Sequence, residues 1–311
     1  MPTAVSLFSG CGGSDAGLHN AGFNILMAND VLPYAAEVYK TNLPETDYIV
    51  GDIRDIRSFP DSDILVGCYP CQGFSQGGAR KPNSGINFLY REFDRALRQI
   101  KPKAFIVENV SGMRRKDNQK LFENQLIRFR LAGYRVKFQE LNAKHYGVAQ
   151  DRRRVFFVGI RSDIDAEYEF PKPTHGPGCD NPYVTLRDAI GDLPAWPEGE
   201  FWIEPFHWYY LSRNRRCEWH EQSKTIVSHP RHMPLHPISP ALKKNGADEW
   251  TFTTNEPARR FSYREAFRLQ GFDRNLMLPD TAPLRMKYKV VGNAVPPPLF
   301  NAVVRAIPDI W

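Results

Sequence analysis

One cysteine stands in a segment that could carry chemistry. Cys71 follows a proline in the run Cys68-Tyr69-Pro70-Cys71, just after the short apolar segment Ile64–Val66. A free thiol has a pKa of about 8.5 and is only a few per cent thiolate at neutral pH, so a nucleophilic cysteine needs basic neighbours or a helix end to ionise it. The Cys-x-x-Cys spacing permits three interpretations: a redox pair, half of a zinc site, and a lone nucleophile at Cys71.

The surrounding residues favour the lone nucleophile. A structural zinc site needs a second pair of ligands, whereas Cys179 and Cys217 lie far apart in the sequence. A thioredoxin-like pair begins a helix, whereas Cys71 is followed by a glycine- and serine-rich run that extends to Gly85. We therefore expect no metal, and a cysteine held on a proline turn at the end of a strand.

An acid and two arginines are candidates for the rest of this site. Glu108 ends the apolar run Phe105–Val107, and Arg152 and Arg154 come just before the apolar run Val155–Ile160. Taken singly, a buried ion pair would explain Glu108, and a solvated surface would explain the arginines. A cysteine, an acid and two arginines at one edge of a sheet together indicate a shared site.

A glycine-rich turn follows the first predicted strand. Its residues, Phe8-Ser9-Gly10-Cys11-Gly12-Gly13, would let a ligand approach the backbone at a helix N-terminus. Asp30 ends the second predicted strand, and Asp52 lies in Gly51-Asp52-Ile53, which would follow a further strand before Ile64; these positions suit a ribose diol and an adenine amino group. The pattern favours an adenosine-containing cofactor; a tight turn without a ligand and two turn-forming acids are the alternative.

The elements that would position these residues alternate along the first half of the chain. Brief apolar runs bounded by turn residues predict strands at Ala4–Phe8, Asn24–Ala28, Ile64–Val66, Ala104–Val107 and Val155–Ile160. Apolar residues at helical spacing predict helices at Tyr34–Asn42, Phe88–Ile100 and Gln119–Leu131. This alternation predicts a doubly wound α/β fold around a parallel sheet, whose ligands bind beyond the carboxyl ends of the strands.

The second half of the chain follows a different pattern. From about Asp180 to Asn255, prolines, tryptophans, histidines and arginines are interleaved without a long periodic segment. Order returns where Ser262 and Glu265 form a predicted capping box for a helix that Gly271 would end. A last helix is predicted at 298–306. The chain therefore divides into two differently built parts.

Composition excludes several classes of protein. The 311 residues are 42% hydrophobic, which excludes wholesale disorder, and no apolar run approaches the roughly 20 residues of a membrane span. Five cysteines are too few for a disulfide scaffold, and the first residues do not read as a secretory signal. We expect a cytoplasmic protein without a membrane partner, and the net charge of +6 favours anionic partners.

In their order and spacing, these motifs resemble those of the DNA (cytosine-5) methyltransferases, in particular the bacterial modification enzymes. The resemblance covers most of the chain, and six segments carry it: Phe8–Gly13, Gly67–Ser75, Glu108–Val110, Gln150–Arg154, Arg264–Phe272 and Gly292–Pro297. It implies a Rossmann-like sheet that binds S-adenosylmethionine and a small, irregular target-recognition domain. The implied boundaries are 1–182 for the catalytic domain, 183–287 for the recognition domain, and 288–311 for a segment that returns to the catalytic domain.

The resemblance also implies a mechanism. Cys71 would attack C6 of a cytosine flipped out of the duplex, while Glu108 would hold N3 and the exocyclic amino group. Arg154, with Arg152, would hold O2 and help keep the thiolate ionised. C5 would then take a methyl group from S-adenosylmethionine. The positions that match the family's cofactor contacts are Phe8, Gly10, Gly13, Asp30, Asp52, Pro70 and Asn293.

This sequence departs from the family's motifs at several positions. Cys68 places a second thiol near the nucleophile, and we expect it to be buried and structural. Asp30 stands where the family more often has Glu, which would weaken ribose binding. The usual Asp-x-Arg-Asn-x-Leu block appears as Ser84–Leu89, without the acid and the arginine, and Val290 stands where Gln is frequent.

The irregular segment between about 183 and 260 is in the place of the DNA-reading region. We expect DNA contacts from Gln72, Ser75, Arg80, Arg213, Arg215, Arg231 and His232. The tryptophans of the same region are expected to build a small core rather than stack on bases, namely Trp196, Trp202, Trp208 and Trp219.

The expected partner is double-stranded DNA, bound by a monomer. A restriction endonuclease acting on the same site is a further partner to expect, and an enzyme without such a partner is the alternative. Two other functions stay open: a tRNA cytosine-5 methyltransferase, which usually carries a Cys-Phe-Thr tripeptide that this chain lacks, and a thiol–disulfide oxidoreductase using Cys68 and Cys71.

Overall fold

The computed structural model describes residues 1–70 and 88–311, which form two compact units. The first unit comprises residues 1–142, 153–172 and 299–311, and the second comprises 143–152 and 173–298. These divisions differ from the predicted boundaries, because the short segment 143–152 belongs to the second unit and the chain returns to the first only at residue 299.

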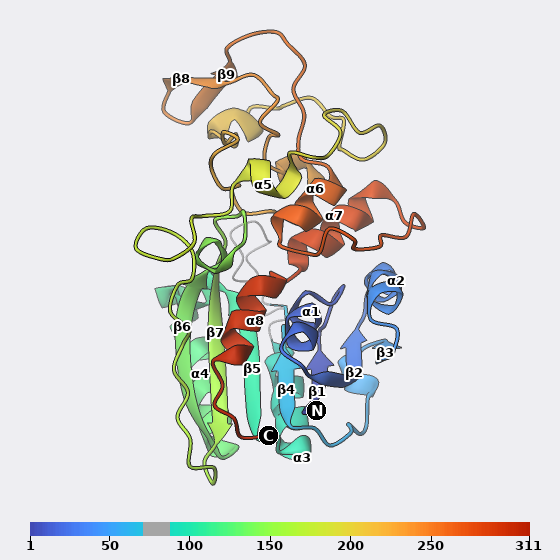
Figure 1. Cartoon of the computed structure of the whole chain (residues 1–311), viewed down its shortest axis with the longest axis vertical. Coiled ribbons are helices and arrows are strands. Elements are labelled where there is room, and N and C mark those ends of the chain that lie inside the picture. The colour runs from blue at the N-terminus through green and yellow to red at the C-terminus, as the bar shows by residue number, and fades with distance from the viewer. Residues whose placement is uncertain (71–87) are drawn as a thin grey trace. The chain divides into compact units, whose positions relative to one another are not determined.

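The first unit is built on a seven-stranded sheet with the order β3-β2-β1-β4-β5-β7-β6 (Figure 1). The first five strands along the chain are parallel, as predicted, but β7 is antiparallel to both β5 and β6. The predicted doubly wound sheet is therefore confirmed, and it is parallel except at the edge formed by β7 and β6. The strands are β1 (Thr3–Leu7), β2 (Asn24–Asp30), β3 (Asp47–Val50), β4 (Ile64–Gly67), β5 (Ala104–Val110), β6 (Tyr134–Asn142) and β7 (Arg153–Arg161).

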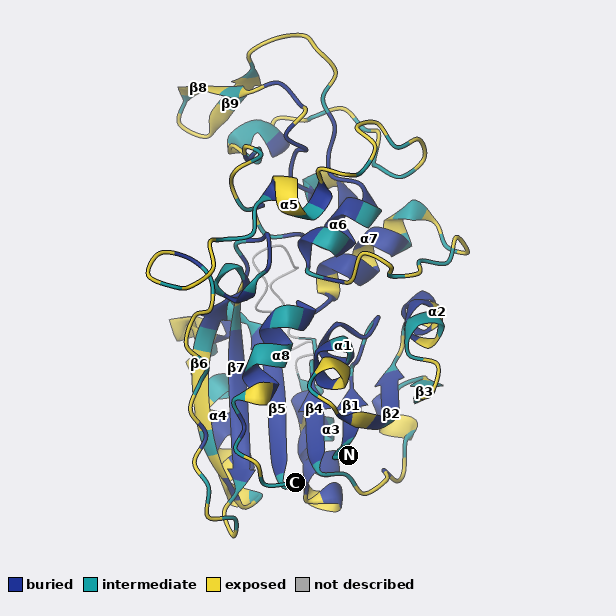
Figure 2. Ribbon diagram, viewed as in Figure 1, coloured by how far each residue is buried: buried dark blue, intermediate teal, exposed yellow. Residues whose placement is uncertain are grey.

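Helices cover both faces of this sheet, and its central strands are buried (Figure 2). One face carries α3 (Tyr90–Ile100) and α4 (Gln119–Leu131), whose aromatic and aliphatic side chains form the main hydrophobic core with the strands. Near the other face lie α1 (Gly13–Asn20) and α8 (Pro297–Arg305), joined by a hydrogen bond of 3.0 Å from Asn301 Nδ2 to the Gly17 carbonyl. The remaining helix, α2 (Pro33–Asn42), follows β2.

Local sequence explains where these helices begin and end. Pro33 occupies the first turn of α2, where its missing N–H costs nothing. Lys101 takes a left-handed conformation after α3, and Pro102 follows it, so the helix cannot continue. Gly67 ends β4 beneath α3, where a Cβ would lie 2.3 Å from the Phe93 ring. A glycine is thus required for α3 to pack against the strand that leads into Cys71.

The second unit has little regular structure. Its elements are α5 (Leu186–Ile190), α6 (Tyr263–Leu269), α7 (Leu284–Asn293) and the two-stranded antiparallel sheet of β8 (Leu242–Gly246) and β9 (Glu249–Phe252). The predicted capping box is confirmed: Ser262 and Glu265 bond each other's backbone N–H at the start of α6. Among the described residues, no helix is long and apolar enough to cross a membrane.

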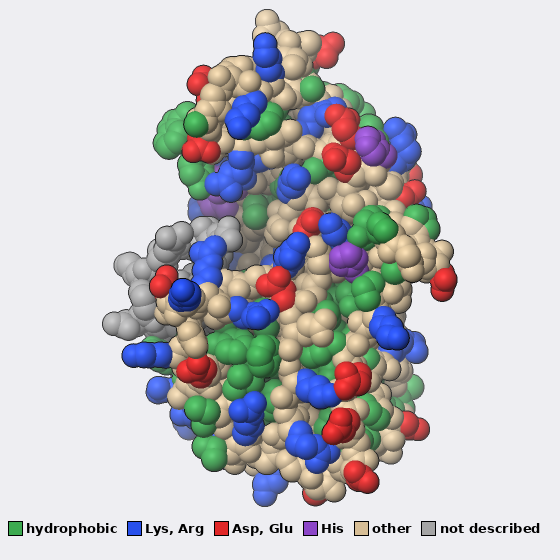
Figure 3. Space-filling view, turned by 90° about the vertical axis from the view of Figure 1, so that its left-hand side faces the viewer, with side chains coloured by type: hydrophobic (Ala, Val, Ile, Leu, Met, Phe, Trp, Pro, Cys, Tyr) green, Lys and Arg blue, Asp and Glu red, His purple; other side chains and the backbone are tan. Residues whose placement is uncertain are grey.

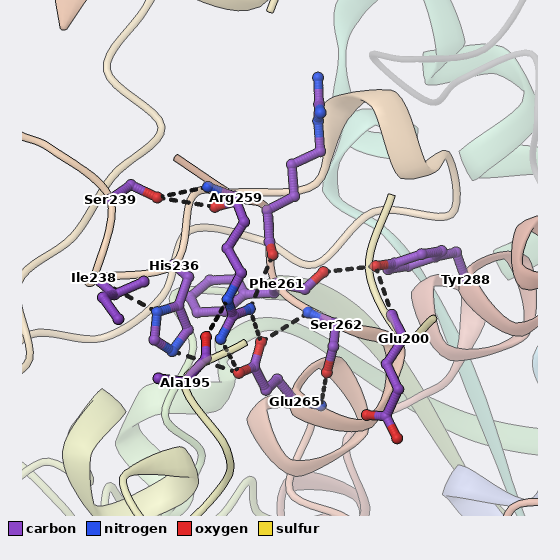
Figure 4. A network of polar contacts seen from close by, with 11 residues as sticks. Ala195, Glu200, His236, Ile238, Ser239, Arg259, Phe261, Ser262, Glu265 and Tyr288 are labelled. Carbon is purple, nitrogen blue, oxygen red and sulfur yellow. Dashed lines mark hydrogen bonds and ion pairs between the residues drawn. The ribbon is translucent and has the colours of Figure 1, made fainter. Parts of the chain in front are cut away.

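A buried ion pair organises the core of the second unit (Figure 4). The Arg259 guanidinium donates two bonds of 2.7 and 2.8 Å to the Glu265 carboxylate, with both side chains at most 1% exposed. It also donates to the Ala195 carbonyl, and the Arg259 backbone bonds the Ser239 hydroxyl. Tyr288 from α7 donates to the Phe261 carbonyl at 2.7 Å. Hydrogen bonds between side chains and the backbone thus connect segments of this unit that are not joined by a helix or a sheet.

The predicted tryptophan core is not found. None of the four tryptophans is buried, and the side chain of Trp208 is 80% exposed. The expectation was wrong because the core of this unit is built from Tyr210, Tyr288, Phe261 and the buried Arg259 and Arg260 instead.

Candidate active site

Glu108 and Arg154 form an ion pair at the ends of two neighbouring strands. Arg154 Nε lies 2.9 Å from Glu108 Oε1, and the two side chains are 13% and 10% exposed. Glu108 lies near the carboxyl end of β5, which pairs with β4 in parallel, and Arg154 is the second residue of β7. Burial lowers the pKa of Arg154, and the nearby Glu108 carboxylate opposes this effect. The structure therefore brings together the predicted acid and one predicted arginine.

The residues that precede Cys71, the predicted nucleophile, are held by β5 and α4. Asn109 Nδ2 donates to the Tyr69 carbonyl at 3.2 Å, and the Tyr69 hydroxyl lies 2.5 Å from Gln125 Oε1. Pro70 is the last residue described before the gap. Cys71, Gln72, Ser75 and Arg80 lie outside the described residues, so their predicted roles stay predictions.

Cys68 is suited to a structural role. Its side chain is partly buried, and burial together with the nearby Glu108 carboxylate raises the pKa of its thiol well above the usual range. A thiol with such a pKa stays protonated at neutral pH and is a poor nucleophile. This environment weighs against a thiol–disulfide reaction initiated by Cys68.

The glycine-rich turn has the strained backbone typical of a ligand-binding loop. Phe8 has φ 60°, a left-handed conformation that a non-glycine residue rarely adopts, and Gly10 and Gly12 have φ of 54° and 87°. A Cβ on Gly12 would lie 2.9 Å from the Tyr39 ring, whereas one on Gly10 would meet no described atom within 4 Å. The chain at Gly10 is therefore open to an approaching ligand. The other predicted residue of this turn, Gly13, is buried as the first residue of α1.

The two predicted cofactor acids have different surroundings. Asp30 accepts bonds of 3.0 Å from the backbone N–H groups of Gly10 and Leu32, so it holds the glycine turn in place. Asp52 pairs with Arg54 and accepts from its backbone N–H, which lowers the pKa of Asp52 to about 2. Asp52 is therefore ionised at neutral pH, and Asp30 is tied to the backbone of the glycine turn.

Asp15 is a buried acid that sequence analysis missed. Its carboxylate accepts hydrogen bonds from the hydroxyls of Ser6, Ser14 and Tyr39 at 2.8 to 2.9 Å, and its side chain is 0% exposed. Burial raises its pKa to about 6, and these hydrogen bonds lower it. Its position two residues after the glycine pair was the only signal in the sequence, and many helix N-termini share such an acid.

Arg152 lies in the second unit and is used differently from Arg154. Its side chain is 2% exposed, and its guanidinium donates to the carbonyls of Ile226, Gly292 and Ala294 at 3.0 to 3.1 Å. The Arg152 guanidinium thus binds three backbone carbonyl groups from two different segments of the chain. Asn293, predicted to contact the cofactor, is exposed at the last position of α7, between two of these carbonyls in the sequence.

The predicted DNA-reading residues of the second unit share one neighbourhood. Arg213 is exposed and lies over the Tyr209 ring, whereas Arg215 is partly buried over the Tyr210 ring. Arg231 and His232 belong to one 3-10 turn, and Arg231 pairs with Glu204. Burial and nearby positive charge lower the pKa of His232 to about 4, so its imidazole is neutral at pH 7.

Comparison with known proteins identifies the family. The model of the C-5 cytosine-specific DNA methylase family matches residues 3–309. The chain belongs to this family. It is 38% identical to the Type II methyltransferase M.BsuRI of Bacillus subtilis over 97% of this chain and 78% of that protein. It is 37% identical to M.NgoPII of Neisseria gonorrhoeae over 97% and 94% of the two chains.

Solved structures share the fold of this methyltransferase. A mutant of Spodoptera frugiperda DNMT2 matches with a TM-score of 0.73 and 17% identity, covering 98% of this chain and 99% of that one. S. pombe Dnmt2 methyltransferase matches with a TM-score of 0.69 and 17% identity, covering 98% of both chains. At this identity the likeness shows the fold alone. The protein is a DNA (cytosine-5) methyltransferase with a mostly parallel α/β sheet, and neither alternative function is favoured.

Proposed function

We propose that this methyltransferase acts on a cytosine flipped out of one specific sequence in double-stranded DNA, through a transient bond between Cys71 Sγ and C6 of the base. The observation that supports this most directly is the Glu108–Arg154 ion pair. It places an anionic and a cationic group side by side, as the hydrogen-bonding edge of cytosine requires. Glu108 lies on β5, the strand next to β4, and the end of β4 leads into Cys71.

Each residue has a defined task in this reaction. The Cys71 thiolate adds to C6 while N3 takes up a proton, and the Glu108 carboxylate accepts from the protonated N3 and from the exocyclic amino group, which relieves the negative charge that the attack creates. Arg154 holds O2, and Arg152 supports it by fixing the backbone before β7. C5 becomes nucleophilic and takes the methyl group that S-adenosylmethionine supplies. A base then removes the C5 proton, and the electron pair of that bond expels Cys71 as a thiolate.

The glycine turn fits an adenosine-containing methyl donor. The open space at Gly10 admits a ligand close to the backbone, and the Asp30 carboxylate lies beside it, where it accepts from the Gly10 and Leu32 N–H groups. Asp52 is charged at the end of the neighbouring strand. We assign the binding of S-adenosylmethionine to Phe8, Gly10, Gly13, Asp30, Asp52, Pro70 and Asn293.

The second unit, together with residues that follow Cys71 in the sequence, would read the DNA. Arg213, Arg215, Arg231 and His232 supply the cationic and hydrogen-bonding groups that phosphates and guanine edges need. We assign Gln72, Ser75 and Arg80 to the same interface. The enzyme would act as a monomer in the cytoplasm, and its relatives' Type II names suggest an endonuclease that cuts the same sequence.

Expression in a host that lacks cytosine methylation tests this proposal. Conversion sequencing of the host DNA should show 5-methylcytosine in one consensus sequence, and Cys71→Ser should abolish it. Duplex DNA that carries 5-fluorocytosine in that sequence should trap a covalent adduct with the wild type, because fluorine cannot leave as a proton does. Host DNA without methylation, indistinguishable between wild type and Cys71→Ser, would overturn the proposal.

A further inference from the structure

A group of aromatic rings stands on the surface of the second unit without being part of its core. It comprises Trp208, Tyr209, His207, His229 and His232, which we call the aromatic platform. The Trp208 side chain is 80% exposed and that of Tyr209 is 42% exposed. A single exposed ring is ordinary, whereas several adjoining rings with polar groups around them are typical of an interaction surface.

The rings of the aromatic platform contact one another in sequence. Trp208 meets Tyr209 edge to face, with ring centroids 5.7 Å apart, and Tyr209 meets His232 at 5.6 Å in the same way. His207 lies nearly parallel to Tyr209, and His229 is 5.4 Å from His232. Each ring therefore limits the movement of the ring next to it, and Trp208 is the outermost ring of this row.

The charges around the aromatic platform are positive. Arg213 lies over the Tyr209 ring at 5.9 Å, and burial, followed by the charge of Arg215, lowers the pKa of His232. Glu204, the acid beside this group, is paired with Arg231 at 2.5 Å. Figure 3 shows basic and acidic side chains interspersed on the face that it draws. An aromatic surface beside arginines suits a polyanion that has flat apolar rings.

A buried arginine fixes the backbone that carries the aromatic platform. Arg260 is 1% exposed, and its guanidinium lies 4.3 Å from the Phe206 ring and 4.8 Å from the Tyr210 ring. It donates to the Glu204 carbonyl at 2.9 Å. The Tyr210 hydroxyl donates to the Met233 carbonyl at 2.8 Å, which ties the segment to the turn that carries His232. Phe206 and Tyr210, which lie on either side of Trp208 in the sequence, are therefore held in place. These contacts do not involve the Trp208 side chain itself.

From this geometry we propose that Trp208 packs against the DNA duplex and supplies binding energy that does not depend on salt. The proposal rests on the DNA-binding function proposed above and adds a contact to it. The arginines would neutralise phosphates, while the indole removes its own apolar surface and that of a sugar or base from water. Because the two contributions differ in physical origin, they differ in their response to ionic strength.

The test is a salt titration of DNA affinity with the full chain. The probe is a duplex that contains the consensus sequence that the wild type methylates. Its binding is measured by fluorescence anisotropy between about 50 and 300 mM NaCl. Trp208→Ala should weaken binding about fivefold or more at every salt concentration. The slope of log affinity against log salt should stay at the wild-type value. Trp208→Phe should recover most of the lost affinity, because it keeps a flat ring.

Two variants serve as controls. Arg213→Ala should reduce the magnitude of the salt slope by about one, as expected for the loss of one phosphate contact. Trp196→Ala removes another half-exposed tryptophan of the same unit, which contacts Phe201 rather than the aromatic platform, and should leave the affinity within twofold of wild type. Thermal melting should confirm that each variant is folded.

The outcomes separate this proposal from the one on which it rests. If Trp208→Ala binds DNA as tightly as wild type, or if it changes the salt slope, the Trp208 contact is refuted while methylation by the wild type still supports the enzyme's function. If wild type neither methylates nor binds duplex DNA, both proposals fall together.

Discussion

Glu108 and Arg154 meet diagonally across the antiparallel pair of β5 and β7. Arg154 lies opposite Val110 in the register, so its side chain reaches back along the strand to Glu108, with 2.9 Å between Nε and Oε1. In such a pair, the neighbouring strands rather than a flexible loop set the distance between the charges. The acid that would hold the target base is therefore already oriented before any base arrives.

Replacing Glu108 by Gln should separate its chemical role from its structural one. Gln keeps the shape of the side chain but cannot neutralise the ring during attack, so methyl transfer should slow by about 10²–10⁴-fold. DNA affinity should stay within a few-fold of wild type. Single-turnover methylation and anisotropy check the two quantities. A variant that methylates at the wild-type rate would contradict the role of Glu108.

Removing Arg154 should cost stability as well as activity. Arg154→Ala leaves the Glu108 carboxylate in a site that is about 10% exposed without its cation, which should lower the free energy of unfolding by about 3 kcal/mol. Arg154→Ala combined with Glu108→Gln should lose less than the sum of the two single changes. Urea unfolding measures this; strictly additive losses would show that the pair is not coupled.

Asp15 makes stability depend on pH in an unusual direction. The pKa of Asp15 is about 6 in the folded protein, and its ordinary value of 3.8 applies to the unfolded chain. Between these two values the folded state binds a proton that the unfolded state has already released. The stabilisation of wild type relative to Asp15→Asn is thus full below pH 4 and is lost as the pH rises through 6, by about 3 kcal/mol at most. Urea unfolding of both proteins from pH 4 to 7 measures this difference, and a difference that grows with pH would contradict the assignment.

Asp30 should matter for the cofactor and little for DNA. Asp30→Ala removes the acceptor for two backbone N–H groups, including that of Gly10, and should weaken S-adenosylmethionine binding about tenfold or more. Asp30→Glu restores the charge with the side chain that the family more often has. Titration calorimetry with S-adenosylmethionine compares the variants. Unchanged cofactor affinity in Asp30→Ala would remove Asp30 from the proposed site.

Gly67 should tolerate no side chain. Gly67→Ala would place a Cβ 2.3 Å from the Phe93 ring and should lower the free energy of unfolding by about 1–3 kcal/mol. Gly51→Ala is the matched control, because a Cβ there meets no described atom within 4 Å and its φ is not left-handed. Thermal and urea unfolding compare the two. Equal stability of both variants would show that α3 adjusts freely to β4.

Much of the first unit was predictable because its strands are buried and its helices amphipathic. All five predicted strands are present to within a few residues, and the helix Gln119–Leu131 has the predicted bounds. The sequence did not reveal β6, an edge strand in which Arg135, Lys137 and Glu140 interrupt the apolar pattern. The antiparallel direction of β7 follows from its pairing with that missed strand.

The candidate site was predictable only where it lies on strands. Glu108 and Arg154 come together because both stand at the edge of the sheet that the apolar runs marked. The contacts of Arg152 could not be predicted, since its three carbonyl partners are 74 to 142 residues away in the sequence. The exposure of Trp208 was missed for a different reason. The core of the second unit contains buried arginines, a residue type that hydropathy assigns to the surface.

The division of the first unit among three stretches of chain has a consequence during synthesis. Residues 299–311 supply the bonds from Asn301 to Gly17 and from Arg305 to Asn20, and Trp311 meets Phe23 edge to face with ring centroids 4.9 Å apart. A nascent chain that lacks them would carry an incompletely covered sheet face while the ribosome is still translating. The first unit therefore cannot complete its fold until residues 299–311 have been synthesised, so a chain whose synthesis stops before residue 299 would be exposed to proteolysis.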